Sequence, residues 1–164
     1  MEAFFSTFRN RIDAKGRVSV PAPFRALLAK QGPENSVYLG PDIVADANFE
    51  AQALVAGGNA HLAALHARID QLPEFSTERA DLEDTLLASL NMAGLDPEGR
   101  VTLPAALLEH AGLKAPGEAV FVGRGRSFQI WEPKAWEARS AAATTRVKAQ
   151  IRAANTAANT EVPK

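Results

Sequence analysis

Two arginines, Arg17 and Arg100, follow the same short turn sequence in two distant parts of the chain. Residues 13–22 read Asp-Ala-Lys-Gly-Arg-Val-Ser-Val-Pro-Ala, and residues 96–105, 83 positions later, read Asp-Pro-Glu-Gly-Arg-Val-Thr-Leu-Pro-Ala. Six of these ten positions are identical. A guanidinium group on a rigid backbone is a planar fork of donors that suits phosphate oxygens and the edge of guanine. The duplication therefore indicates a two-fold pseudo-symmetric object whose function lies where the copies agree.

The other motif residues have the chemistry of a tight turn. Asp13 and Asp96 can accept backbone N–H bonds, and Gly16 and Gly99 permit a positive φ. Each arginine then alternates with a core valine, so its side chain is expected to leave the sheet on the outer face. From the residues alone, an arginine after a turn aspartate is more often an ion-pair partner that holds the hairpin than a ligand-binding group. Both roles stay open at this point.

The elements that must position these arginines can be read from periodicity and from turn residues. The first copy predicts a strand, a turn, a short strand and a helix that opens at proline and ends at Gly32, and the second copy repeats the plan from the short strand at Val101 to a helix that ends at Gly112. A further β segment follows each helix, at 36–40 and at 119–131, where residues 123–126 read as a hairpin turn rather than a phosphate loop. Helices are predicted over 49–68 and 76–93, capped at Ser76 or Thr77 in the second case, and again from Pro133. Residues 153–164 are predicted to be disordered.

Composition limits the functional classes. The chain has 164 residues, 46% of them hydrophobic, and no cysteine, which excludes disulfides and thiolate chemistry and favours a reducing compartment. Residues 1–8 lack the features of a signal peptide and no segment predicts a membrane span, so we expect a cytoplasmic protein. The net charge of −1 is segregated: Lys and Arg outnumber Asp and Glu by six to two in residues 1–30 and ten to five in 100–164, but are outnumbered twelve to two in 31–99. A local positive face is therefore possible.

No constellation predicts catalysis or metal binding. His61, His66 and His110 have no carboxylate or cysteine at ligand spacing, and Ser19 and Thr102 have no histidine base near them in the sequence. We therefore expect no enzyme activity, no cofactor, no metal and no small-molecule substrate. The aromatic side chains Phe49, Phe75 and Trp136 are possible contacts between subunits, although burial within the subunit is the commoner outcome.

The doubled Asp-x-x-Gly-Arg motif, together with the run Gly-Leu-x-x-Pro-Gly-Glu-x-x-Phe-Val-Gly that begins at Gly112, resembles the MraZ family of the AbrB-like superfamily. The resemblance covers about residues 4–137. It implies an α+β fold, a pseudo-two-fold swapped-hairpin β-barrel with flanking helices. The corresponding division is a first repeat at 1–48, connecting helices at 49–93, a second repeat at 94–137, and a C-terminal helix and tail at 138–164, all in one integrated domain.

The resemblance also implies a nucleoid-associated bacterial transcriptional regulator of the division and cell-wall gene cluster, assembled as a ring and bound to double-stranded DNA. It favours DNA contact by Arg17, whereas for Arg100 the structural and DNA-binding roles stay equally open. The expected DNA-binding residues are Arg9, Arg11, Lys15, Arg17 and Arg100. Assembly as a ring would raise the weak affinity of one protomer for DNA through avidity, and we therefore expect short direct repeats in the DNA. The alternative is an oligomeric, antitoxin-like protein-interaction module.

Overall fold

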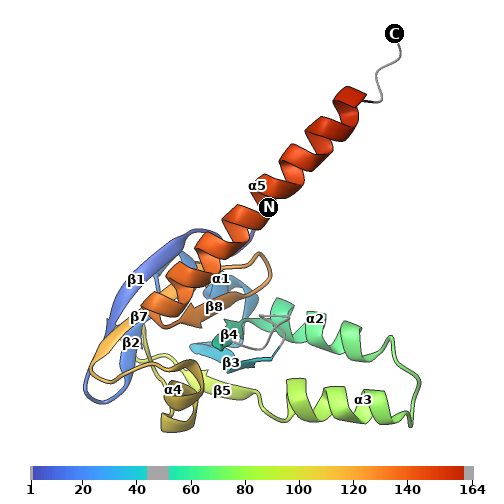
Figure 1. The fold of residues 1–164 in the computed structure, drawn as a ribbon. Coiled ribbons are helices and arrows are strands. Elements are labelled where there is room, and N and C mark those ends of the chain that lie inside the picture. The colour runs from blue at the N-terminus through green and yellow to red at the C-terminus, as the bar shows by residue number, and fades with distance from the viewer. Residues whose placement is uncertain (1, 44–51, 161–164) are drawn as a thin grey trace. The chain divides into compact units, whose positions relative to one another are not determined.

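A computed structural model describes residues 2–43 and 52–160. The chain divides into two compact units, Met1–Pro133 and Lys134–Lys164. All of the strands found in the described residues belong to the first unit, and the second contains most of the last helix (Figure 1).

Within the described residues, eight antiparallel strands form one sheet in the order β5-β3-β4-β8-β7-β1-β2-β6. A bridge between Leu95 and Val101 brings its two ends together, so the sheet is a nearly closed barrel. The strands are β1 (Thr7–Ile12), β2 (Arg17–Ser19), β3 (Ser36–Asp42), β4 (Ala53–Gly57), β5 (Asn91–Gly94), β6 (Arg100–Thr102), β7 (Gly117–Gly123) and β8 (Phe128–Trp131).

Each repeat has the element order ββαββ, and the two repeats exchange strands. The first repeat consists of β1, β2, α1 (Ala22–Gln31), β3 and β4, and the second of β5, β6, α4 (Ala105–Ala111), β7 and β8. Strand β1 pairs with β7 of the other repeat, and β5 pairs with β3. The two repeats also meet directly where β2 pairs with β6 and β4 pairs with β8. The expected pseudo-two-fold swapped-hairpin barrel is therefore confirmed.

The two motif copies lie antiparallel to each other, with Val18 opposite Val101 at the centre of the β2–β6 pair. At the two ends of this pair, the Val20 N–H donates to the Gly99 carbonyl (3.0 Å) and the Leu103 N–H donates to the Gly16 carbonyl (2.8 Å). Each turn glycine is thus bonded to the opposite repeat. The pseudo-two-fold axis passes through the middle of the ribbon that carries both arginines.

The core lies inside the barrel and joins the two repeats through aromatic side chains. Phe24 of α1 packs on Phe128 of β8, with ring centroids 4.9 Å apart, and on Phe4 at 5.3 Å. Ile12, Val18 and Val101 are also buried. Since aromatic burial contributes a large share of core stability, neither repeat has a complete core alone.

The remaining helices of the first unit, α2 (Asn59–Ile69), α3 (Thr77–Leu82) and the π-helical turn η1 (Glu83–Leu87), connect the repeats (Figure 1). The predicted cap is confirmed, because the Ser76 hydroxyl accepts from the Arg79 backbone N–H at 3.2 Å. Two helix predictions were wrong in part. Residues 53–57 form β4 and residues 91–94 form β5, because pairing with neighbouring strands outweighs the helix preference of alanine and leucine. Residues 49–51 lie outside the described residues.

The prediction of disorder from residue 153 was wrong as far as residue 160, because helix α5 (Pro133–Thr160) continues through this segment. Its side chains from 153 to 159 are exposed, and the high helix propensity of alanine accounts for the extension without packing. Residues 161–164 lie outside the described residues. Among the described residues, no helix combines the length and the apolarity needed to cross a lipid bilayer. The division at 1–48, 49–93, 94–137 and 138–164 stays a prediction.

The turn glycines give a test of the fold. Gly16 has a φ of +82°, and a Cβ added to it would lie 3.0 Å from the Leu103 carbonyl oxygen. Gly16→Ala is expected to lower the free energy of unfolding by more than the roughly 1–2 kcal/mol that a positive φ costs an L-residue. Chemical denaturation measures this.

Two alanine variants serve as controls. Gly112→Ala has a similar positive φ, +65°, but open space around the added Cβ, and should cost less than Gly16→Ala. Gly94→Ala, with no neighbouring atom within 4 Å, should stay within about 0.5 kcal/mol of the unsubstituted protein. Equal losses at Gly16 and Gly112 would show that the contact with the second repeat is unimportant.

Candidate nucleic-acid interface

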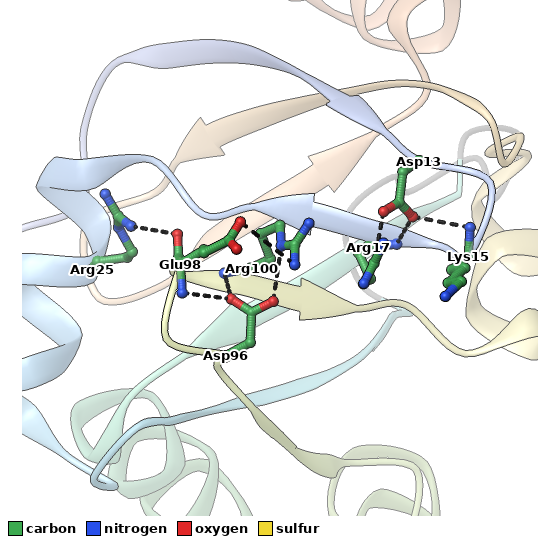
Figure 2. Close-up of polar contacts among 7 residues, drawn as sticks. All are labelled: Asp13, Lys15, Arg17, Arg25, Asp96, Glu98 and Arg100. Carbon is green, nitrogen blue, oxygen red and sulfur yellow. Dashed lines mark hydrogen bonds and ion pairs between the residues drawn. The ribbon is translucent and has the colours of Figure 1, made fainter.

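The first turn is organised by the carboxylate of Asp13 (Figure 2). Its Oδ1 accepts from the backbone N–H groups of Lys15 at 3.0 Å and Arg17 at 2.9 Å. Its Oδ2 accepts from Nε of the Arg17 guanidinium at 2.7 Å. Together with the Gly16 N–H bond to the Asp13 carbonyl, 3.0 Å, these contacts fix the arginine at the start of β2.

The second turn repeats this arrangement. Oδ1 of Asp96 accepts from the backbone N–H groups of Glu98 and Arg100, both at 2.9 Å, and Oδ2 accepts from Arg100 Nε at 2.8 Å. Both aspartates thus accept bonds from the turn backbone, and their role as turn scaffold stays a prediction. The structural alternative for the arginines, an ion pair with the preceding aspartate, is therefore present in both copies.

This ion pair does not enclose the arginines. The side chain of Arg17 is 34% exposed and that of Arg100 is 27% exposed. Only Nε of Arg17 is used by Asp13, so its two terminal nitrogens have no partner among residues 2–43 and 52–160. The aspartate orients the guanidinium and leaves its outer edge available to a ligand.

The strand register places the basic side chains on one outer face. Ile12 is opposite Val18 and Val18 is opposite Val101, and all three are buried, so their sequence neighbours point outward. On that face Arg11 lies across from Ser19, which in turn lies across from Arg100. Arg17 and Arg100 are diagonal neighbours on this face, and diagonal neighbours in a sheet are roughly 7–8 Å apart, within reach of long side chains.

Arg9 and Arg11 of β1 extend this face, as their alternating exposure indicates. Nε of Arg9 forms an ion pair with Glu118 Oε2 at 2.6 Å. The side chains of Arg11 and Lys15 have no hydrogen-bond or ion-pair partner in the described part of the chain, and both are exposed. The outer face of β1, β2 and β6 thus brings together Arg9, Arg11, Arg17 and Arg100, and Lys15 is exposed in the turn that joins β1 to β2.

A sixth basic residue, Arg25 of α1, was missed by the sequence analysis. Its Nη1 donates to the backbone carbonyl of Glu98 at 3.2 Å, so this side chain of the first repeat covers the second turn (Figure 2). The sequence neighbourhood of Arg100 contains no further basic residue, but its spatial neighbourhood does. Only the pairing of the repeats could have revealed it, since 73 residues separate Arg25 from Glu98.

The turn bonds shift the titration of both aspartates. The pKa of Asp13 is lowered from its ordinary 3.8, first by the hydrogen bond from the Arg17 backbone N–H, while desolvation opposes the shift. The pKa of Asp96 is lowered in the same way by Arg100. The side-chain hydrogen bond to Asp96 raises the pKa of Arg100. The described residues contain no group of three or more histidine, aspartate or glutamate side chains placed to hold a metal ion.

Two interlocked ββαββ repeats, each with an Asp-x-x-Gly-Arg turn, define a duplicated swapped-hairpin barrel of the AbrB-like class. A "Transcriptional regulator MraZ" from Xanthobacter autotrophicus is 41% identical over 148 residues, which cover 90% of this chain and 88% of the relative. The chain belongs to the MraZ family of transcriptional regulators.

Further comparisons agree with this assignment. Proteins with the same name from Gluconacetobacter diazotrophicus and Pelagibacter ubique are 43% and 40% identical, over 89% and 82% of this chain and 89% and 81% of the respective relatives. A sequence profile of the family described as "MraZ protein, putative antitoxin-like" matches residues 87–156. That segment contains the second turn.

The lowered pKa values predict how the stability depends on pH. Above the ordinary pKa of 3.8, both carboxylates are ionised in the folded and the unfolded chain, and their contribution to stability is fully present. As the pH falls through the lower pKa of the folded state, this contribution is lost. Urea unfolding from pH 7 to pH 3 should therefore show a steeper loss of stability for the natural sequence than for the double variant Asp13→Asn, Asp96→Asn. Parallel curves would contradict the role of the two turns.

Proposed function

We propose that this protein is a sequence-specific, DNA-binding transcriptional regulator that acts without a cofactor and without catalysis. The basic outer face of β1, β2 and β6 carries the proposal, because hydrogen bonds within the two turns fix the guanidinium groups of Arg17 and Arg100 in the absence of any ligand. A two-stranded β-ribbon fits the major groove, where arginine can read guanine or contact phosphates. The names of the relatives support the regulatory role.

Within this proposal, Arg17 has the central role and Arg9, Arg11, Lys15 and Arg100 add contacts. Arg17 has its terminal nitrogens available, and Lys15 and Arg11 are exposed beside it. The resemblance to the family adds the finer statements: a nucleoid-associated protein of the cytoplasm, assembled as a ring, that binds short direct repeats upstream of its own operon in the division and cell-wall gene cluster.

An antitoxin-like protein-interaction module is the second candidate. The description of the family profile favours it, and so does Phe75, a residue that is 100% exposed. Phe75 also has a φ of +63°, unusual for a bulky residue, in the connection between α2 and α3. The network around Arg79 holds this connection: its Nη1 donates to the Leu72 carbonyl at 3.2 Å and its Nη2 to Asp70 at 3.0 Å. An aromatic side chain presented in this way suits contact with another protein. The predicted subunit contact of Phe49 lies outside the described residues.

The substitution Arg17→Ala tests the central contact. A gel-shift assay on DNA from upstream of its own gene should show an affinity loss of about 1–3 kcal/mol for each engaged protomer, with a shallower dependence on salt. The assembled mass, measured by light scattering, should not change. Arg68→Ala on α2 removes an exposed arginine from another element and should bind normally.

Two outcomes would speak against DNA binding through this residue. Unfolding of the Arg17→Ala variant would favour a purely structural role. Arg17→Lys, which keeps the positive charge but loses the planar fork of donors, then tests whether DNA binding depends on the charge or on the geometry of the guanidinium. The absence of salt-sensitive DNA binding, together with a stoichiometric protein partner in a pull-down, would favour the interaction module.

The number of DNA repeats tests the ring. One protomer offers few cationic contacts, so a single repeat should bind weakly. If several protomers present the same face, two or three repeats in tandem should raise the affinity by roughly 10² to 10⁴, because the later contacts become intramolecular. Titration of DNAs with one, two and three repeats measures this, and equal affinities would refute the argument.

A further inference from the structure

The pseudo-two-fold axis of the basic face bears on the direction in which this face can lie along a DNA duplex. A face with true two-fold symmetry makes the same contacts after a half turn, and symmetric DNA-binding faces are accordingly matched to palindromic sites. A ribbon whose halves were identical could therefore lie on a duplex in either of two opposite directions. To bind an asymmetric site, such as a single copy of a direct repeat, in one direction only, the two halves of the ribbon must differ.

The two halves of this face do differ, and the differences lie at exposed positions. Residues 83 positions apart are equivalent, and the pair Arg17 and Arg100 is retained. Around this pair the basic residues of the first half have no basic counterpart. The equivalent pairs are Arg9 and Met92, Arg11 and Gly94, and Lys15 and Glu98.

The structure bears out this equivalence. Strand β1 meets β2 through Ile12 and Val18, and the segment after β5 meets β6 through Leu95 and Val101, which are the residues 83 positions later. Met92 is 66% exposed, so an apolar side chain stands where the first half has the arginine of the Arg9–Glu118 pair. The difference is therefore present on the surface and is not confined to the sequence.

Glu98 gives Arg100 a second carboxylate partner. Its Oε2 lies 3.5 Å from Arg100 Nη2, and its side chain is 72% exposed. Arg100 thus has carboxylate partners at two of its nitrogens, Asp96 at Nε and Glu98 at Nη2, whereas Arg17 has one. An exposed carboxylate beside a phosphate is repelled, while the ammonium of Lys15 at the equivalent position is attracted.

Arg25 reduces this difference without removing it. It brings one cation to the second turn, where its own equivalent position in the second repeat is Leu108. The first half then has four cations against the two carboxylates of Asp13 and Glu118, and the second half has Arg25 and Arg100 against Asp96 and Glu98. The face is positive at the first turn and balanced at the second.

We propose that the Lys15/Glu98 difference sets the direction in which each protomer lies on double-stranded DNA. The first turn binds the phosphate backbone, and Glu98 keeps the second turn away from it. The inference rests on the proposed function, because it assigns a direction to the same face. It also gives a physical reason for direct rather than inverted repeats: every protomer that obeys this polarity faces the same way.

The experiment exploits the absence of cysteine from the chain. Ala14→Cys places one thiol on the exposed first turn for attachment of an iron chelate that cleaves nearby DNA. On DNA from upstream of its own gene, this protein should cut one flank of each repeat. The charge exchange Lys15→Glu, Glu98→Lys, made in the same background, leaves the net charge at −1 and should move the cuts to the opposite flank.

A milder variant covers the case in which the exchange does not fold. Glu98→Gln should place cuts on both flanks and tighten binding by about threefold at moderate salt, since roughly one further phosphate contact becomes available. Glu74→Gln, at an exposed position in the α2–α3 connection, makes the same charge change and should leave both the cuts and the affinity as they were.

The outcomes separate this inference from the function on which it rests. Specific binding with cuts on the same flank in all variants would overturn the proposed polarity and leave the DNA-binding function intact. Cuts on both flanks with the natural Lys15 and Glu98 would overturn it as well. Failure of the cysteine-bearing protein and of the natural sequence to bind this DNA would instead contradict the proposed function.

Discussion

The antiparallel pairing of the two motif copies is the interaction on which the rest of the structure depends. Strands β2 and β6 are only three residues each, and their pairing is extended by the bonds from Val20 N–H to Gly99 and from Leu103 N–H to Gly16. Each turn glycine therefore both reverses its own chain and accepts a bond from the other repeat. Because the arginine follows the glycine directly, its position is a consequence of barrel assembly. The bonds that join β2 and β6 in the barrel therefore also fix where the two arginines lie.

The sequence was sufficient to predict those elements whose conformation is set by their own residues. The turn glycines, the prolines that open α1 and α4, and the alternation around Val18 all have local causes, and the structure contains each of these elements. Strand β4 was missed because Ala-Leu-Val-Ala-Gly lacks polar alternation, since most of its side chains are buried. Strand β5 has weak β propensity and exists through its pairing with β3. The repeat contained both answers, because β4 has in the first repeat the place that β8 has in the second, and β5 has in the second repeat the place that β1 has in the first.

The candidate site was predictable to the same extent. Local spacing was enough to select Arg17 and Arg100 and to assign Asp13 and Asp96 to the turns. It could not decide between an ion-pair role and a ligand-binding role, and the ion pair seen in the structure does not exclude the second role. The aspartate takes Nε and the backbone N–H groups, which leaves the outer edge of the Arg17 guanidinium available. Arg25 was beyond the reach of local reasoning, because its contact with Glu98 exists only when the repeats exchange strands.

Fusion of two repeats in one chain has a physical consequence that a dimer of identical subunits cannot share. In such a dimer, a substitution at an exposed turn position changes both halves of the ribbon at once, so the two-fold symmetry of the face survives. In this chain the positions that the barrel requires have stayed alike, namely the turn aspartate, the glycine, the arginine and the buried valine. The exposed positions around them, such as Lys15 and Glu98, differ in charge without cost to the core, because neither is buried. A symmetric scaffold can thus carry an asymmetric surface, and the asymmetry resides where a charged duplex would encounter it.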